Sequence, residues 1–150
     1  MTASSAAARS AAPTSVLIDT NVLLDLILAR APWDAEAARL VAAVVDGRLA
    51  GFVAAHTVTT VYYLVEKAKG RSVATTAVHD LLVALTVAPL EGNDFQRALA
   101  LGLPDFEDAV QVAACLKVGA TILVTRNPKD FKDAPVPTQS AAQVLASIGM

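Results

Sequence analysis

Apolar residues along the chain alternate between short continuous runs and longer stretches with helical spacing. The short runs are rich in β-branched and aliphatic residues, which is typical of buried strands. They predict four strands at residues 15–18, 50–53, 86–90 and 121–124, and a further extended piece at 135–138. The first run stops at Asp19, which begins a polar triplet suited to capping the next helix.

The longer stretches place apolar residues on one face at helical spacing. They predict helices at residues 22–29, 32–45, 57–69, 71–85, 93–101 and 103–118, with a last helix from residue 140. Gly47, Gly70 and Gly119 follow three of these helices, and glycine in that position is a common termination signal. Pro104 lies where a first helical residue is expected, a position that favours proline.

Strands that alternate with helices predict a parallel sheet with helices packed on both faces. The expected fold class is therefore a single three-layer α/β/α domain at residues 15–146. Residues 1–14, mostly Ala, Ser and Thr, predict a disordered lead, and residues 147–150 a short tail. Such sheets bind ligands beyond the carboxyl ends of their strands, where Asp19 and the pair Arg126–Asn127 are placed.

The composition changes this picture little. Hydrophobic residues make up 55% of the 150 residues, and the mean hydropathy is +0.51, which raises the question of a membrane segment. A spanning helix needs about 20 predominantly apolar residues, and no run here is that long, so we expect a soluble, cytoplasmic protein. Cys115 is the single cysteine, which excludes an internal disulfide and a cysteine zinc site. It lies in an apolar helical run and is interpreted as a core residue.

The charges are unevenly distributed along the chain. A net charge of −2 and a pI of about 5.6 argue against a general nucleic-acid binder. Acidic and basic residues are nevertheless interleaved in the last third of the chain, at Asp105, Glu107, Asp108, Arg126, Lys129, Asp130, Lys132 and Asp133. Such interleaving suits a site that holds cations and still approaches phosphates.

Each acidic residue has a structural explanation when it is considered alone. Asp19 follows a strand and is placed to cap the next helix. Asp105, Glu107 and Asp108 occupy the first turns of a predicted helix, where negative charge complements the helix dipole. Asp130 is typical of a turn. For a single carboxylate, these interpretations are favoured over a catalytic role.

The carboxylates in combination favour a metal site. Asp105 and Asp108 are three residues apart and share a helix face, whereas the opposite stripe is apolar and should pack on the sheet. Carboxylates that converge from separate elements repel one another unless a cation lies between them. Oxygen ligands, one cysteine and two histidines in the whole chain favour Mg²⁺ or Mn²⁺ over zinc. Such an ion can activate water and stabilise a phosphoryl transition state.

Three segments resemble the motifs of PIN domains. Residues 16–25, VLIDTNVLLD, are similar to the opening motif, and residues 105–111, DFEDAVQ, to the helix that bears the third acid. Residues 122–131, ILVTRNPKDF, are similar to the closing strand and loop. Their order and spacing agree with the family, and the resemblance covers about residues 15–146. It implies an endoribonuclease dependent on Mg²⁺ or Mn²⁺, commonly the VapC-type toxin of a bacterial toxin–antitoxin pair.

The resemblance also implies roles for individual residues. The residues expected to be catalytic are Asp19, Asp108 and Asp130. The residues expected to hold the metal are Asp19 and Asp108, completed by Asn127 or Asp130 and supported by Asp105. We expect Arg126 and Lys129 to contact the substrate. The partners implied are an RNA substrate, an antitoxin protein and a second copy of the chain in a homodimer.

One position departs from the family pattern. PIN domains usually carry a Glu on the helix after the second strand, and Thr60 aligns there. Glu66, the only acid on this helix, lies about 240° round from Thr60 at 100° per residue and cannot replace that carboxylate. His56, near the start of the same helix, is interpreted as a surface or capping residue.

Three classes of function therefore remain open. The leading prediction is a metal-dependent endoribonuclease. The alternative, favoured by Thr60, is a weakened or inactive PIN domain that binds RNA or a protein. The third class is a phosphatase-like α/β hydrolase, which is disfavoured because the Asp19-Thr20-Asn21 segment lacks the second Asp of such loops.

Overall fold

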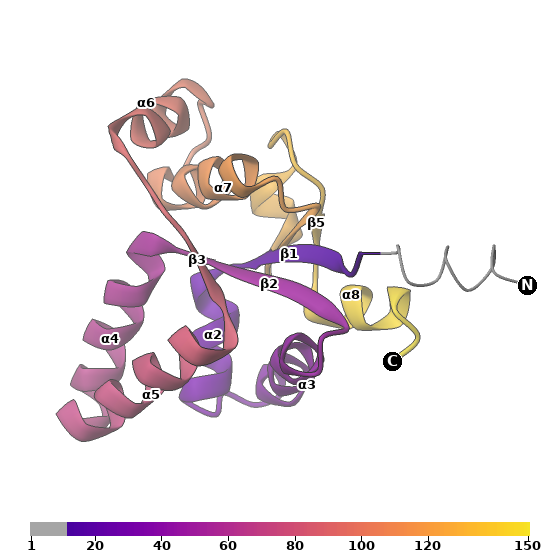
Figure 1. Cartoon of the computed structure of the whole chain (residues 1–150). Helices are drawn as coiled ribbons and strands as arrows, with labels where there is room; N and C mark the ends of the chain where they lie inside the picture. Colours follow the sequence, from indigo (N-terminus) through magenta and orange to yellow (C-terminus); the bar gives the residue numbers. More distant parts are fainter. Residues whose placement is uncertain (1–11) are drawn as a thin grey trace, which may run out of the picture.

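The computed structural model describes residues 12–150 of the chain (Figure 1). Within this range the chain forms five strands, seven α-helices and one 3₁₀ helix. In chain order the elements are β1 (Thr14–Ile18), α2 (Thr20–Ile27), α3 (Trp33–Val45), β2 (Leu49–Ala54), α4 (Ala55–Lys69), α5 (Arg71–Ala84), β3 (Thr86–Ala88), α6 (Gly92–Ala100), α7 (Phe106–Val118), β4 (Ile122–Val124), η1 (Pro128–Phe131), β5 (Thr138–Gln139) and α8 (Ala141–Ser147).

β1 lies at the centre of a parallel sheet with the strand order β3-β2-β1-β4-β5. It pairs with β2 on one side and β4 on the other, so that Val16 lies opposite both Gly51 and Ile122. The outer pairs, β2 with β3 and β4 with β5, are also parallel. Figure 1 shows α6 and α7 on one face of the sheet and the other α-helices on the opposite face. The predicted three-layer fold with a central parallel sheet is confirmed.

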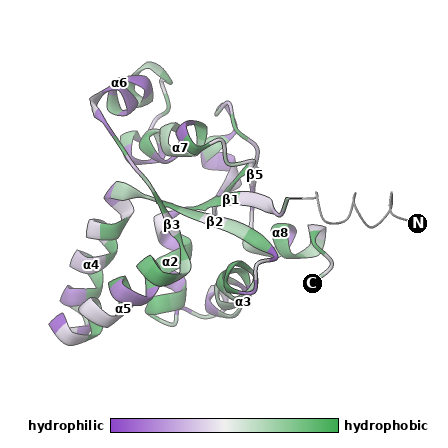
Figure 2. Ribbon diagram, in the orientation of Figure 1, coloured by the Kyte–Doolittle hydropathy of each residue, from purple (hydrophilic) through white to green (hydrophobic). Residues whose placement is uncertain are grey.

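The side chains of β1 enter two separate hydrophobic cores, because successive residues of a strand point to opposite faces. Val16 and Ile18 belong to the larger core, which includes residues of α2, α3, α4, α5 and α8, whereas Leu17 belongs to the core beneath α7. All three are fully buried, and each such side chain contributes about 1.5–3 kcal/mol. Figure 2 shows hydrophilic residues on α6 and at the far ends of α4 and α5, away from the sheet.

The start of α7 differs from the sequence prediction. Pro104 was predicted as a first helical residue, but the helix begins at Phe106, and Asp105 is its N-cap in an extended conformation. The Asp105 Oδ1 accepts a hydrogen bond from the Asp108 backbone N–H at 2.9 Å. This bond satisfies a free N–H of the first turn and holds Asp105 outside the helix. The other end agrees with the prediction, since Gly119 terminates α7 in the left-handed conformation.

The segment after β4 was predicted as a loop and contains the short helix η1. Pro128 begins this helix, and Phe131 closes it with its ring buried in the core beneath α7. The Asp130 backbone N–H donates to the Asn127 carbonyl at 3.0 Å. These contacts fix the polar residues of the segment beside the end of β4.

The two ends of the chain bear on the predicted domain boundaries. β1 begins at Thr14, and most of the predicted disordered lead falls on residues 1–11, which lie outside the described residues. At the other end, the backbone N–H groups of Gly149 and Met150 donate to carbonyls of α8, so these residues close the helix. Cys115 is buried in the core beneath α7, as predicted. Among residues 12–150, no helix combines the length and apolarity needed to cross a membrane.

Candidate functional site

The candidate site lies where β1 and β4 end side by side. Ile18 pairs with Val124, so Asp19 and Thr125 are the next residues on the two strands. The Asp19 backbone N–H donates to the Val124 carbonyl at 2.9 Å. The carboxyl edge of a parallel sheet is where such folds bind ligands, and the first two polar residues beyond this edge are therefore adjacent.

Asp19 is buried and incompletely satisfied. Only 4% of the residue is exposed, and its side chain does not cap α2, contrary to the structural explanation considered from the sequence. The Thr125 hydroxyl donates to its Oδ2 at 3.0 Å, whereas its Oδ1 has no hydrogen-bond partner among residues 12–150. Burial, and then the charge of Glu107, raise its pKa to about 6 against the lowering effects of Thr125, Thr20 and His56. A buried carboxylate oxygen without a partner costs free energy, and a hydrogen-bond donor or a cation beside it would remove that cost.

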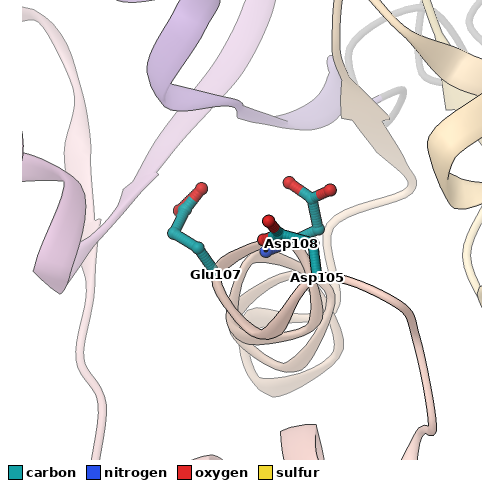
Figure 3. Close-up of side chains that lie close together, drawn as sticks. All are labelled: Asp105, Glu107 and Asp108. Carbon is teal, nitrogen blue, oxygen red and sulfur yellow. Dashed lines mark hydrogen bonds between the residues drawn. The ribbon is translucent and has the colours of Figure 1, made fainter.

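Asp108 lies among the other carboxylates. Burial raises its pKa to about 7, and the charges of Asp105, Asp19, Glu107 and Asp130 add to the shift in that order. One carboxylate oxygen from each of Asp105, Glu107 and Asp108 lies within 4.8 Å of the others. Figure 3 shows Glu107 and Asp108 projecting from the same side of α7. The start of α7 therefore carries a cluster of three carboxylates, and the charges of Asp19, just after β1, and of Asp130 in η1 act on it.

A buried polar network lies beneath these acids. The amide nitrogen of Gln111, which is fully buried in α7, donates to the Thr20 and Thr57 hydroxyls at 2.9 and 3.0 Å and to the Glu107 Oε2 at 3.0 Å. The two threonine hydroxyls are 2.9 Å apart. The His56 Nε2 lies 2.7 Å from the same Glu107 oxygen. These bonds fix α7 relative to α2 and α4.

This network was not predicted from the sequence. His56 was interpreted as a surface or capping residue, and Gln111 was not singled out. A signal for Gln111 was present, because it is a polar residue in the middle of an otherwise apolar helical run. Nothing in the sequence indicated that His56 would meet α7, since that contact joins positions 51 residues apart.

Two of the predicted site residues from the segment after β4 line a cavity with the acids of α7. The cavity measures about 400 Å³ and is lined by Leu103, Pro104, Asp105, Asp108, Lys129, Asp130, Lys132 and Asp133. Lys129 is thus placed on the same cavity as Asp105, Asp108 and Asp130. Asn127 is held at the end of β4, where its backbone N–H donates to the Thr125 hydroxyl at 3.2 Å.

Arg126 is engaged in a different cluster. Its Nε lies 3.0 Å from the Asp25 Oδ2, and its guanidinium stacks 4.1 Å above the Trp33 ring. Asp25 is 1% exposed; burial raises the pKa of its carboxyl, and the charges of Arg126 and then Arg30 lower it. Arg126 therefore neutralises a buried acid, and its predicted contact with a phosphate stays a prediction.

An apolar cavity lies away from the acidic cluster of α7. It measures about 510 Å³ between α2, α3 and α5 and is lined by side chains such as Leu26, Val41 and Leu81. Asp80 is the one ionisable residue in its lining. It offers no set of metal ligands, so the acidic end of the sheet remains the candidate site.

Comparison of sequences assigns the chain to a family. A PIN domain sequence profile matches residues 15–129. The chain belongs to the PIN domain family. The match spans the three motifs noted in the sequence almost completely, and it includes Asp19, Asp108 and Asn127.

Solved structures similar to this PIN domain include bacterial toxin–antitoxin complexes. VapBC-1 from nontypeable Haemophilus influenzae aligns with a TM-score of 0.66 and 16% identity over 86% of this chain and 99% of that chain. A toxin–antitoxin complex from Klebsiella pneumoniae aligns with a TM-score of 0.63 and 22% identity over 84% of this chain and 97% of that chain. VapC20 from Mycobacterium tuberculosis, a sarcin–ricin loop cleaving toxin, aligns with a TM-score of 0.60 and 18% identity over 72% of this chain and 86% of that chain. No curated protein matches the chain significantly. These likenesses establish the fold.

The donors at this PIN domain site fit a hard divalent cation. The acidic side chains here offer carboxylate oxygens, the ligand type that Mg²⁺ and Mn²⁺ prefer, and the Asp19 Oδ1 is buried without a partner among residues 12–150. The Thr60 hydroxyl donates to the His56 carbonyl of its own helix at 3.1 Å, and it supplies no carboxylate to the site.

Proposed function

We propose that this PIN domain is an endoribonuclease that depends on Mg²⁺ or Mn²⁺. The observation that carries the proposal is the buried Asp19 carboxylate, which has an oxygen without a partner among residues 12–150 and is subject to the charge of Glu107. In this proposal Asp19, Asp108 and Asp130 are the catalytic ligands, and Asp105 and Asn127 support them. Membership of the PIN family adds support, because the family comprises nucleases.

The chain's own residues would prepare the site for RNA. A bound Mg²⁺ or Mn²⁺ would supply a water of lowered pKa and a positive charge for the phosphoryl transition state. Thr125 orients Asp19 by donating to its Oδ2, and Asp105 holds the first turn of α7 in place through its cap. Lys129 lines the same cavity as Asp108 and would contact an RNA phosphate.

The comparisons also support a partner. The similar solved structures include toxin–antitoxin complexes, and we propose that this chain is the toxin of such a pair, acting in the cytoplasm and held inactive by an antitoxin protein. A small protein encoded beside its gene would be the first candidate. The expected homodimer stays a prediction.

The direct test of the proposed activity is cleavage of single-stranded RNA in Mn²⁺ or Mg²⁺. The intact chain should cleave, and excess chelator should stop the reaction. Asp108→Asn should reduce the rate about 100-fold, since changes even in residues that only orient metal ligands typically cost 10–100-fold. Asp80→Asn is the matched control, because Asp80 is exposed on α5, away from the other acids.

The outcome separates the two leading functions. If the intact chain binds RNA and Mn²⁺ but does not cleave, the alternative of a non-catalytic binding module replaces the proposed nuclease. Cleavage that survives both chelation and Asp108→Asn would not come from the proposed metal site. The phosphatase-like hydrolase is set aside, because the chain belongs to the PIN family.

A further inference from the structure

Glu107 is held by one of its two oxygens. Its Oε2 lies 2.7 Å from the His56 Nε2, which must donate to a carboxylate, and accepts a second hydrogen bond from the Gln111 amide at 3.0 Å. The donors come from α4 and from the next turn of α7. Its Oε1 accepts no side-chain hydrogen bond from residues 12–150. One oxygen of this carboxylate is therefore fixed, and the other is free to act as a ligand.

The carboxylate of Glu107 lies at the acidic site. One of its oxygens is within 4.8 Å of oxygens of both Asp105 and Asp108, and Figure 3 shows its carboxylate on the same side of α7 as that of Asp108. Its charge also acts on Asp19 across the space between α7 and β1. A carboxylate in this position adds repulsion to a site that already contains several acids.

A second observation is independent of the acidic cluster. The Asp19 Oδ1 is buried without a partner among residues 12–150, and the charge of Glu107 acts on the Asp19 carboxylate. The group that holds Glu107 is also buried, since Gln111 is fully enclosed and bonded to Thr20 and Thr57. Burying a glutamine costs free energy unless its polar atoms are satisfied. The Gln111 amide nitrogen is satisfied by these contacts and by Glu107, whereas its Oε1 has no partner among residues 12–150.

We propose that Glu107 is a ligand of the divalent metal at this site, held in position by His56 and Gln111. The inference rests on the proposed metal-dependent function. It gives the site a carboxylate from α7 in place of the one that Thr60 does not supply from α4. His56 and Gln111 are then positioning residues, because they act on the metal only through Glu107.

The experiment is a calorimetric titration of the intact chain with Mn²⁺. Glu107→Gln keeps an oxygen that accepts from His56 and Gln111 but removes the charge, and it should weaken Mn²⁺ binding at least about tenfold. Glu66→Gln, an exposed position on α4, is the matched control and should bind as the intact chain does. The double variant Glu107→Gln with Thr60→Glu should recover part of the lost affinity.

The positioning role of His56 has its own readout. His56→Leu removes the donor to Glu107 and should weaken Mn²⁺ binding about tenfold, whereas His56→Gln restores an N–H donor and should recover most of the affinity. A residue that only fills space beside α7 would not show this recovery. Melting curves in chelator establish that each variant is folded, and His56→Leu serves as the second variant if Glu107→Gln does not fold.

The failures of the two proposals differ. The role of Glu107 is overturned if Glu107→Gln binds Mn²⁺ as tightly as the intact chain while Asp19→Asn abolishes binding. If Glu107→Gln does not fold, the same result for His56→Leu overturns it. If the intact chain itself does not bind Mn²⁺, the proposed metal-dependent function fails, and the role of Glu107 fails with it.

Discussion

Replacing Asp19 by asparagine should make the chain more stable in chelator and unable to bind Mn²⁺. At pH 8 the native carboxylate is ionised in a buried position, although its pKa is about 6 rather than 3.8. Since one pKa unit corresponds to about 1.4 kcal/mol, this ionisation costs the folded chain about 3 kcal/mol. The new amide has donors that need partners, so we expect a net gain of about 2 kcal/mol.

The gain should depend on pH in a defined direction. The folded state binds a proton at Asp19 more tightly than the unfolded state does, so the stability that this group contributes falls as the pH rises from about 4 to about 6. The asparagine side chain of the variant does not titrate, and the advantage of the variant should therefore be absent near pH 4 and complete above about pH 7. Urea denaturation of both chains in chelator measures the difference.

Addition of Mn²⁺ should reverse the ranking. A ligand that binds only the folded state stabilises it, and this stabilisation should appear in the parent chain but not in Asp19→Asn. Thr125→Val is a useful comparison, because it removes the hydroxyl that donates to Asp19 while leaving the charge. Equal stability of the parent and Asp19→Asn across this pH range would show that burial of the ionised Asp19 carboxylate does not destabilise the fold.

Arg126→Ala should destabilise the fold by about 3 kcal/mol, because it leaves Asp25 buried without its nearest cation. The substitution also removes the stacking of the guanidinium on Trp33, which adds to the loss. Arg30→Ala should cost far less, since Arg30 lies 3.9 Å from Asp25 and is more exposed. Denaturation midpoints of the two variants give the comparison.

The double variant Asp25→Asn with Arg126→Ala isolates the ion pair. Once Asp25 is neutral, the loss of Arg126 should cost less than in the parent chain, and the difference measures their coupling. A different result is expected if Arg126 instead contacts phosphate, as predicted from the sequence. In that case Arg126→Ala should weaken RNA binding. Its stability should stay within about 0.5 kcal/mol of the parent, the range usual for surface substitutions.

The fold followed from the sequence because its signals are local. The continuous apolar run before Asp19 indicated a strand buried on both faces, and β1 is the central strand. Gly119 marked the end of α7 correctly. The start of α7 was wrong because Pro104 and Asp105 are both favoured at a helix start, and the capping bond from Asp105 to Asp108 decides between them.

The site was only partly predictable for a similar reason. Asp19 and Asp108 were identified from polar residues at a strand end and from a resemblance in motif, both of which are visible in a short window. The bond between His56 and Glu107 joins α4 to α7, and the ion pair of Arg126 with Asp25 joins the end of β4 to α2. Contacts of this kind depend on how helices pack across the sheet, which no local pattern specifies.

In the proposed metal site, Asp19 and Asp108 hold one divalent cation at the carboxyl edge of the sheet. The most direct measurement is an anomalous difference map from a crystal of the intact chain soaked in Mn²⁺. We expect a single strong peak about 2.1 Å from a carboxylate oxygen of each of these residues, with the Asp19 Oδ1 as one of the ligands. A map at saturating Mn²⁺ with no peak between Asp19 and Asp108, or with its peak at another cluster, would contradict it.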